Sequence, residues 1–296
     1  AERWGSERAH VTFVAMGRYG GRECSYASDA DVIALHEAVG GASDSEAAAS
    51  ATAIVNRVKK LLGSATSQLG IVVDLDLRPE GKNGPMSRTI ASHEEYAQRW
   101  ASTWERQAAV RARPIGDGEL AQAARSLFES MAYRDVSEAE VRDIRLLKAR
   151  MENERLPRGT EPARHVKLGP GGLSDVEWTI QLIQMRAGTN NPALRTPSTT
   201  QAIGSAREHE LISAQDAQTL LDAWDMATRI RAANTLATGR MSGVKLDVVP
   251  RDSAELGALA AILGYGSGGL TALEEDWLRA ARQARDVMER TFWEQQ

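Results

Sequence analysis

The sequence has little of several features that would narrow its class. It has one cysteine, Cys24, in 296 residues, so no disulfide can form within the chain, and a reducing compartment such as the cytoplasm is expected. No apolar run approaches the ~18 residues that a membrane-spanning helix needs. The longest run, 256–266, is interrupted by glycines. These absences exclude a disulfide-stapled scaffold and argue against a membrane partner.

An excess of positive charge is also missing. The chain has 36 Lys and Arg against 40 Asp and Glu, a net charge of −4. With no basic, aromatic-studded stripe, a nucleic-acid partner is not expected. The 42% apolar and 26% charged residues are typical of a globular protein. No signal peptide is visible and the chain opens on Ala1 rather than Met, so we expect a piece of a longer protein.

The first 117 residues mix strand and helix signals. Short β-branched and apolar runs at 11–17, 31–35 and 71–79 predict three strands. Between the second and third, residues 51–70 carry apolar residues near helical spacing, which predicts an amphipathic helix on the sheet. The apolar face of that helix is expected to consist of Ile54, Val58, Leu61, Leu62 and Leu69.

From Ser92 onward, helical signals take over. Ser92 with Glu95 is a possible capping box for a helix that carries Tyr96, Trp100 and Trp104 at intervals of four. We interpret Trp104 as a core residue, with stacking on an adenine as the alternative. Most of the other tryptophans also fall at core-like positions on helices.

Beyond residue 117 almost everything is expected to be helical. Ser137 with Glu140 forms a second capping box, which predicts a helix start. Further helical patterns cover 174–188, 213–239 and 269–295. We therefore predict an α/β domain over residues 1–117 and a helical bundle over residues 118–296.

The stretch GRYGGRECSYASDADVIALHE, residues 17–37, carries the strongest chemical signal. Asp29 and Asp31 are two apart on the expected second strand, so their side chains share a face. Asp74 lies on the third expected strand, with Asp76 on the same face. If the two strands are neighbours, these carboxylates converge, and unpaired buried carboxylates are costly unless cations neutralise them. An all-oxygen ligand set suits magnesium or manganese.

A glycine-rich turn precedes the aspartates. Gly17, Gly20 and Gly21 would let backbone amides approach a phosphate, because no Cβ is in the way. Their spacing matches neither the dinucleotide-binding nor the P-loop pattern. Together with Ser28 and the aspartates that follow it, the turn favours nucleotidyl transfer. In that chemistry one metal activates the incoming hydroxyl and another holds the triphosphate.

Other polar residues near these motifs have competing interpretations. Arg111 and Arg113 either contact a triphosphate, which suits guanidinium geometry, or cover a helix end. Arg106 and Glu105 are expected to form structural pairs near the site, and Cys24 is expected to be a small buried residue rather than a nucleophile. The turn at 167–172 resembles an anion-binding loop, with a docking role between domains as the alternative.

Four motifs in order carry a family resemblance. Residues 17–37, VDLDLRPEGKNGP, TWERQAAVRARP and VKLGPGGLSDVEWTIQ closely resemble the glutamine synthetase adenylyltransferases, a bacterial family of the DNA polymerase beta nucleotidyltransferase superfamily. The resemblance covers about residues 11–190. Members of the family carry an N-terminal module that removes AMP by phosphorolysis and a C-terminal module that adds it from ATP. The motifs here are more similar to those of the C-terminal, adenylylating module.

The resemblance implies an α+β fold, with a polymerase-beta-like nucleotidyltransferase domain over residues 1–117 followed by an all-helical bundle domain over 118–296. It implies that Asp29 and Asp31 bind metal and that Asp74 is the third carboxylate, suited to take the proton from the target hydroxyl. It further implies ATP as substrate, magnesium or manganese as cofactor, and a tyrosine of glutamine synthetase as target. A nitrogen-regulatory signal protein is a further candidate partner.

The sequence leaves several hypotheses open. The leading one is magnesium-dependent transfer of AMP from ATP to glutamine synthetase, which lowers nitrogen assimilation. The alternative is phosphorolytic removal of AMP by the same type of site. A degenerate regulatory module is a third, and the presence of Asp29, Asp31 and Asp74 argues against it. The chain departs from the family pattern at Asp76, where arginine is usual, so that residue is left without a role.

Overall fold

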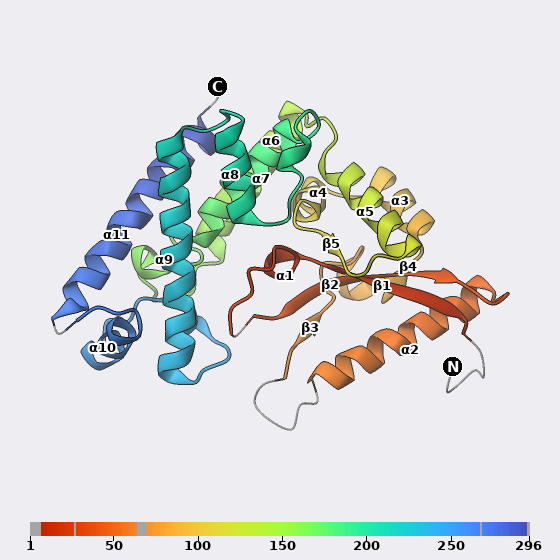
Figure 1. Ribbon diagram of the computed structural model, residues 1–296, viewed down its shortest axis with the longest axis horizontal. Helices are drawn as coiled ribbons and strands as arrows, with labels where there is room; N and C mark the ends of the chain where they lie inside the picture. The colour runs from red at the N-terminus through yellow and green to blue at the C-terminus, as the bar shows by residue number, and fades with distance from the viewer. Residues whose placement is uncertain (1–6, 27, 64–69, 267, 295–296) are drawn as a thin grey trace. The chain divides into compact units, whose positions relative to one another are not determined.

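The computed structural model describes residues 7–26, 28–63, 70–266 and 268–294, and Figure 1 traces the chain. It is mixed α/β, with a small mixed sheet and many helices. The residues separate into two compact units. The first contains the described residues up to Cys24, Ser28–Arg134 and Arg195–Ser198; the second contains Ser25 and Tyr26, Asp135–Leu194 and the described residues from Thr199 onward. The boundary expected between residues 117 and 118 stays a prediction.

Two long antiparallel strands form the centre of the first unit's sheet. β1 (Ala9–Ala15) pairs with β2 (Ala30–Ala38), with Ala9 opposite Ala38 and Ala15 opposite Val32. The short strands are β3 (Val73–Asp74), β4 (Ser87–Arg88) and β5 (Arg113–Pro114). β3 and β4 run parallel to β2, and β5 runs antiparallel to β1. The first two predicted strands are confirmed, with ends shifted by a few residues.

The third predicted strand, 71–79, is shorter than expected. Only Val73 and Asp74 pair with β2. The chain then turns, because the Asp76 N–H donates to Asp74 Oδ1 at 2.6 Å, the Asx-turn geometry that aspartate favours. The strand prediction was therefore wrong beyond Asp74.

The helix on the sheet is α2 (Asp44–Gly63), and it packs through a different face from the predicted one. Its buried residues are Ala47, Ser50, Ala51 and Val55. Among the predicted face, Ile54, Leu61 and Leu62 are exposed, Val58 is half-buried, and Leu69 lies outside the described residues. Small side chains at the contact let the helix approach the sheet closely, so the larger apolar residues point outward.

Two short helices replace the single helix expected from Ser92. α3 (Ile90–Arg99) is capped by Thr89, whose side chain accepts the N–H of Ser92. α4 (Thr103–Ala109) starts with a capping box at Ser102. The predicted capping box was therefore wrong, because threonine three residues earlier supplies the cap.

The aromatic residues of these helices are not core residues. Trp100 is 62% exposed and Trp104 is 41% exposed, so the core interpretation was wrong. Tyr96 donates instead to Glu105, at 2.8 Å. Arg106 is buried and donates to backbone carbonyl oxygens, including that of Met131 at 2.8 Å, so it supports the fold, while its pairing with Glu105 stays a prediction.

The remaining elements are short turns and helices. The first unit also contains α1 (Gly17–Gly20), a 3-10 turn at Gly81–Asn83, and α5 (Glu119–Ala132). The second unit contains α6 (Glu138–Glu154), α7 (Leu173–Ala187), α8 (Thr199–Glu208), α9 (Ala214–Thr238), α10 (Ser253–Ile262) and α11 (Gly269–Met288). Its 3-10 turns are Pro162–Arg164, Pro192–Leu194 and Val244–Asp247, and a π turn, Glu289–Trp293, follows α11.

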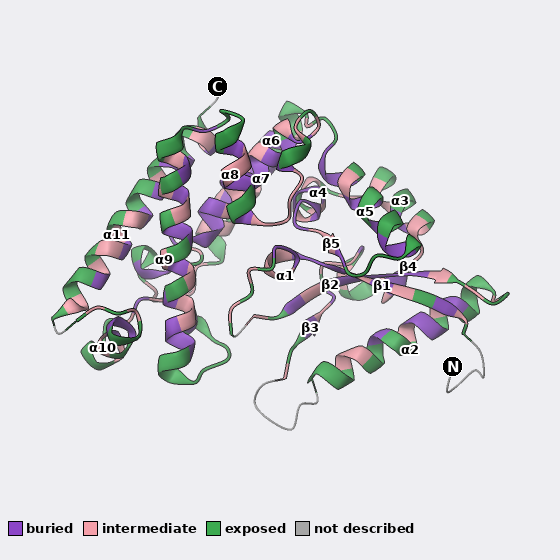
Figure 2. Cartoon of the chain, in the orientation of Figure 1, coloured by how far each residue is buried: buried purple, intermediate pink, exposed green. Residues whose placement is uncertain are grey.

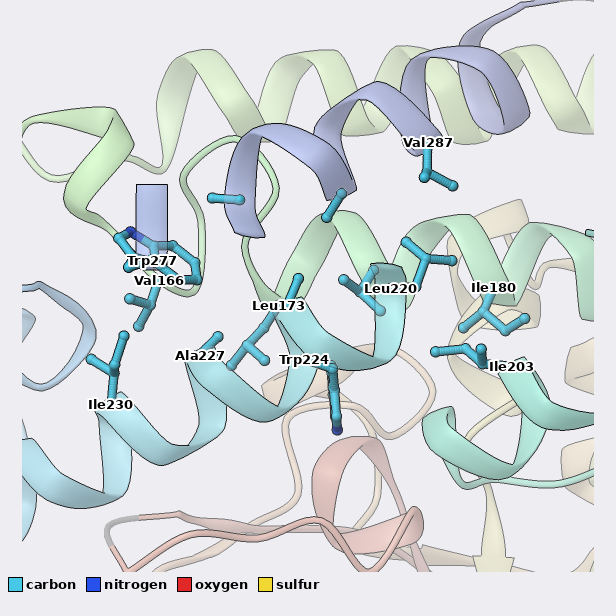
Figure 3. Close-up of a cluster of buried hydrophobic side chains, with 14 of the residues drawn as sticks. Val166, Leu173, Ile180, Ile203, Leu220, Trp224, Ala227, Ile230, Trp277 and Val287 are labelled. Carbon is cyan, nitrogen blue, oxygen red and sulfur yellow. The ribbon is translucent and has the colours of Figure 1, made fainter. Parts of the chain in front are cut away.

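Helices α7 to α11 of the second unit share one apolar core. The capping box of Ser137 and Glu140 at the start of α6 is confirmed. Buried and exposed residues alternate along α11 with helical periodicity (Figure 2). Figure 3 shows Leu173 of α7, Trp224 of α9 and Trp277 of α11 in the same cluster. The helices expected from the patterns at 174–188, 213–239 and 269–295 are confirmed to within a few residues, except that the last closes with the π turn.

Across the described ranges, none of the helices combines the length and the apolar character that crossing a membrane would demand.

Candidate active site

Two of the predicted acidic residues lie side by side on adjacent strands. β2 and β3 pair in parallel, with Ala30 opposite Val73 and Asp31 opposite Asp74. Neighbouring strands are about 4.8 Å apart, and register partners project from the same face of the sheet. The expectation that these two strands are neighbours is therefore confirmed.

Asp29 comes two residues before Asp31 and is exposed. Within the described ranges, His, Cys, Asp and Glu side chains form no group of three or more placed to hold a metal ion. The all-oxygen donors of Asp31 and Asp74 suit magnesium chemically, and the register brings that pair together. A third ligand from Asp29 stays a prediction.

Asp76 does not share the face of Asp74. It lies in the turn after β3, where Lys82 Nζ is 3.3 Å and Arg78 Nη1 is 3.8 Å from its carboxylate. The expectation that Asp76 joins the cluster from a strand was wrong, because the strand ends first. Its own N–H holds Asp74 Oδ1, so its place in the turn orients the Asp74 carboxylate.

The glycine turn packs directly against Asp31. Gly17 has φ +51°, and a Cβ there would be 3.0 Å from Asp31 Oδ2. At Gly20 a Cβ would lie 1.8 Å from the Arg111 carbonyl oxygen, which no side chain tolerates. The Gly20 and Gly21 amides donate to carbonyl oxygens within the turn, at 2.7 and 3.1 Å. Gly20 and Gly21 therefore allow close packing and hydrogen bonds within the chain at this turn. Phosphate binding by the turn stays a prediction.

Arg111 anchors the turn from below the surface. It is 4% exposed, and its Nε donates to the Gly17 carbonyl oxygen at 3.2 Å. Its Nη2 pairs with Glu23 Oε2 at 2.6 Å. The other carboxylate oxygen of Glu23 accepts from Ser198 Oγ at 3.2 Å.

Sequence reasoning missed Glu23. Its partners Arg111 and Ser198 are 88 and 175 residues away in the chain, so no local spacing could reveal these contacts. The available signal was a carboxylate inside the glycine-rich motif, only two residues after Gly21. Glu23 belongs to the support of the turn.

Arg113 holds the same turn from β5. Its Nε donates to the Gly20 carbonyl oxygen at 2.8 Å and its Nη2 to the Tyr19 carbonyl oxygen at 2.9 Å. Its guanidinium carbon lies 5.6 Å from the Tyr19 ring centroid. Both candidate arginines thus position the glycine turn, while direct phosphate contact by either one stays a prediction.

The loop that leads to the aspartates contains Cys24 and Ser28. Cys24 is exposed, so the expectation of a small buried residue was wrong. Desolvation by the surrounding loop raises the pKa of its thiol, and Ser28 hydrogen-bonds to it. A neutral thiol is a weak nucleophile, and the expectation that Cys24 is not a nucleophile stays a prediction. Ser28 itself is half-buried.

The second glycine-rich turn, 167–172, is occupied by the chain's own carboxylate. The Gly171 amide donates to Asp175 Oδ2 at 2.7 Å. Asp175 also pairs with Lys148 Nζ at 2.5 Å and with Arg285 Nη1 at 3.1 Å. This turn therefore binds an internal anion in the second unit.

Comparison with known proteins places these motifs in a family. Residues 2–127 match the family model described as glutamate-ammonia ligase adenylyltransferase, and residues 145–293 match the one described as GlnD PII-uridylyltransferase. The bifunctional glutamine synthetase adenylyltransferase/adenylyl-removing enzymes of Streptomyces coelicolor and Bifidobacterium longum subsp. infantis are 44% and 46% identical to the chain. These alignments cover 99% and 97% of this chain, but 29% and 27% of those relatives, so the chain spans less than a third of their length. By these relatives and the match over residues 2–127, the chain belongs to the glutamine synthetase adenylyltransferase family.

Proposed function

We propose that this chain transfers AMP from ATP to a tyrosine hydroxyl of glutamine synthetase, releases pyrophosphate and so lowers nitrogen assimilation. The observation that carries the proposal is the parallel register of Asp31 opposite Asp74, with Gly17 packed against the Asp31 carboxylate. The names of the relatives, which combine adenylyl transfer with glutamine synthetase, support the substrate. The chain is proposed to work in the cytoplasm, as its single cysteine suggests.

The proposed architecture follows the same family. A polymerase-beta-like nucleotidyltransferase domain would occupy residues 1–117, and an all-helical bundle domain would occupy residues 118–296. The sheet that carries Asp31 and Asp74 lies in the first of these ranges. The motifs favour the adenylylating module of the family over the adenylyl-removing one.

Asp29, Asp31 and Asp74 would hold magnesium or manganese, which when bound would neutralise the triphosphate and favour ionisation of the target hydroxyl. A tyrosine phenol has an ordinary pKa near ~10, so it needs a base at neutral pH. Asp74 is the candidate base, with one of its oxygens held by the Asp76 amide. The phenolic oxygen would form a bond to the α-phosphorus while the bond to the β-phosphate oxygen breaks. Asp74 would take the phenolic proton, and pyrophosphate would leave.

The glycine turn would position the triphosphate. In this proposal Gly17, Gly20, Gly21 and Ser28 line the nucleotide side, and Arg111 and Arg113 fix the turn through its carbonyl oxygens. The arginines would then act on ATP mainly through the position of the turn. This agrees with their hydrogen bonds to Gly17, Tyr19 and Gly20.

The second candidate is phosphorolytic removal of AMP from modified glutamine synthetase. It is favoured by the relatives' names, which include an adenylyl-removing activity. Both directions would use the same carboxylates. The chain can be supplied with ATP and unmodified glutamine synthetase, or with phosphate and the adenylylated form. Glutamine synthetase gains the mass of AMP if the first reaction occurs and loses it if the second one does. A nitrogen-regulatory signal protein is a proposed further partner, supported by the PII-uridylyltransferase match over residues 145–293.

The decisive test is Asp31→Asn, measured as transfer of labelled AMP from ATP to glutamine synthetase in the presence of magnesium. Loss of a metal-binding carboxylate should reduce transfer by at least ~10²-fold, since even outer-shell changes at metal sites cost 10–100-fold. The thermal midpoint should not fall, because Asp31 is only half-buried. Asp44→Asn, an exposed carboxylate of the same unit, is the matched control. Transfer at the wild-type rate by Asp31→Asn would contradict the proposal.

A further inference from the structure

A small cavity in the first unit is separate from the carboxylates of β2 and β3. It has a volume of about 110 Å³ and lies among residues 109–114, α5 and residues 195–197. β5 and α5 lie next to each other at this place (Figure 1). Its lining includes buried apolar residues such as Val110, Pro114 and Phe128. A buried apolar lining lowers the local dielectric and strengthens an ion pair formed beside it.

Positively charged residues outnumber negatively charged ones in the lining of this cavity. Arg113, Arg125 and Arg195 line it, against a single carboxylate, that of Glu129. Among the residues that the structure describes, neither Arg125 nor Glu129 forms an ion pair. Arg113 uses Nε and Nη2 on the glycine turn, and its Nη1 donates to none of the described residues. The lining therefore holds three guanidinium groups against one carboxylate.

Tyr133 adds an aromatic wall and a hydroxyl. The guanidinium carbon of Arg195 lies 5.7 Å from the Tyr133 ring centroid, which fixes the orientation of that arginine. Burial is the main cause that raises the pKa of the Tyr133 phenol. The hydroxyl therefore keeps its proton at neutral pH.

We propose that this cavity binds a phosphate group as a dianion. The composition of the lining argues for a dianion over a monocarboxylate, because it has two more guanidinium groups than carboxylates. A volume of about 110 Å³ has room for a tetrahedral oxyanion of five heavy atoms but not for a nucleotide. Guanidinium groups suit phosphate through paired N–H donors.

This site is linked to the glycine turn by one side chain. Arg113 lines the cavity and also holds the Gly20 and Tyr19 carbonyl oxygens. A bound phosphate would hold the Arg113 guanidinium in place and with it the turn that packs on Asp31. The cavity would thus sense phosphate at a point distinct from the proposed catalytic carboxylates.

Equilibrium dialysis with labelled inorganic phosphate tests the proposal on the whole chain, without nucleotide or metal. The wild type should bind phosphate, and the Arg125→Ala, Arg195→Ala double variant should bind it at least about tenfold more weakly, the loss expected for charge-assisted hydrogen bonds. Glu129→Gln should bind phosphate more tightly, because it removes the only carboxylate of the cavity. Arg240→Ala, at an exposed arginine of the second unit, is the control and should not change binding. Acetate, a monoanion, should compete poorly.

Asp31→Asn separates this site from the proposed catalytic one. Phosphate binding that persists in Asp31→Asn and weakens in the double variant supports the cavity, whether or not the adenylyl-transfer proposal holds. Phosphate binding that is unchanged in the double variant, or absent from the wild type, overturns it. Weaker binding by Glu129→Gln would overturn it as well. Unchanged thermal midpoints of the variants show that each remains folded.

Discussion

The two units differ in whether the charged side chains compared here are paired within the chain or left accessible. In the second unit, Lys148 and Asp175 are each 1% exposed and pair with each other, and Arg285 and Glu152 complete the cluster. In the first unit, the exposed Asp29 and half-buried Asp74 form no ion pair with any residue in the described ranges. Charge that the chain neutralises itself holds helices together, because burial of an unpaired charge is costly. Charge left accessible at a strand end is available to a ligand.

The two glycine-rich turns show the same contrast. At Gly171 a Cβ would lie 1.7 Å from the Ala281 carbonyl oxygen, and the Gly171 amide is taken by Asp175. At Gly17 a Cβ would meet the Asp31 carboxylate, the proposed metal ligand. From sequence both turns are typical of anion sites. The difference lies in whether a carboxylate of the chain already fills the turn.

Replacing Asp175 with asparagine should have the largest effect on stability. Lys148 would keep its buried charge with Glu152, the Ser174 hydroxyl and the weaker amide as partners, and breaking a buried pair costs about 3–5 kcal/mol. Urea unfolding followed by circular dichroism measures the change. Asp225→Asn is the matched control, since its pair with Arg229 is exposed and worth less than about 1 kcal/mol. If Asp175→Asn kept its stability but lost AMP transfer, the distinction between the two units would be wrong.

The first unit buries His36 and His93 and the second buries His165, and desolvation lowers the pKa of all three. In the second unit His165 Nδ1 accepts the Leu168 N–H at 3.1 Å, whereas in the first unit His93 Nδ1 has no hydrogen-bond partner among the described residues. Desolvation, with a smaller effect of Arg88, lowers the pKa of His93 to about 4. The unfolded chain binds a proton below pH ~6.5 and the folded one does not, so stability is complete above that pH and falls as pH drops towards 4.

The loss attributable to His93 should reach about 3 kcal/mol at pH 4, from ~1.36 kcal/mol for each pH step between the two pKa values. His93→Phe, which can still pack on Phe128, should flatten the dependence of the unfolding free energy on pH between 6.5 and 4. His209→Gln, at an exposed histidine, should leave the dependence unchanged. An equally steep dependence in His93→Phe would show that other groups cause it.

Local signals predicted much of the fold, and packing decided the rest. The strands at 11–17 and 31–35 and the capping box at Ser137 depend on neighbouring residues, so the sequence reveals them. The face of α2 depends on what it packs against, and apolar size alone pointed to Ile54 rather than Val55. The third strand was overestimated because an aspartate side chain closes a turn that apolar alternation conceals.

The part of the candidate site that depends on the alternation of side chains along strands was predictable. Asp31 and Asp74 share a face once their strands are neighbours, and the structure pairs them. Glu23 was not predictable, because its contacts with Arg111 and Ser198 come from distant parts of the chain. Tertiary contacts between charged residues leave no periodic signal in a single sequence.

The corrected face of α2 can be tested directly. Val55 is fully buried beside Val32 and Leu75, and Val55→Ala should cost about 2 kcal/mol of unfolding free energy from lost burial and the cavity left behind. Leu61→Ala removes a larger side chain, but one that is 56% exposed, and should change stability by no more than about 0.5 kcal/mol. Chemical denaturation of both variants makes the comparison. A larger loss for Leu61→Ala would restore the face expected from the sequence.

The smallest predicted effect concerns Glu23. Its replacement tests whether this residue positions the proposed site or only stabilises the fold. Glu23→Gln keeps the shape but removes the charge opposite Arg111, so the Arg111 hold on the Gly17 carbonyl oxygen should loosen. We expect kcat/KM to fall about tenfold, equivalent to ~1.4 kcal/mol, and mainly through a higher KM for ATP. Glu80→Gln, which breaks the more exposed pair with Arg88, is the control and should not change KM. A merely structural Glu23 would lower the thermal midpoint and leave the KM for ATP unchanged, and that result would remove Glu23 from the support of the nucleotide turn.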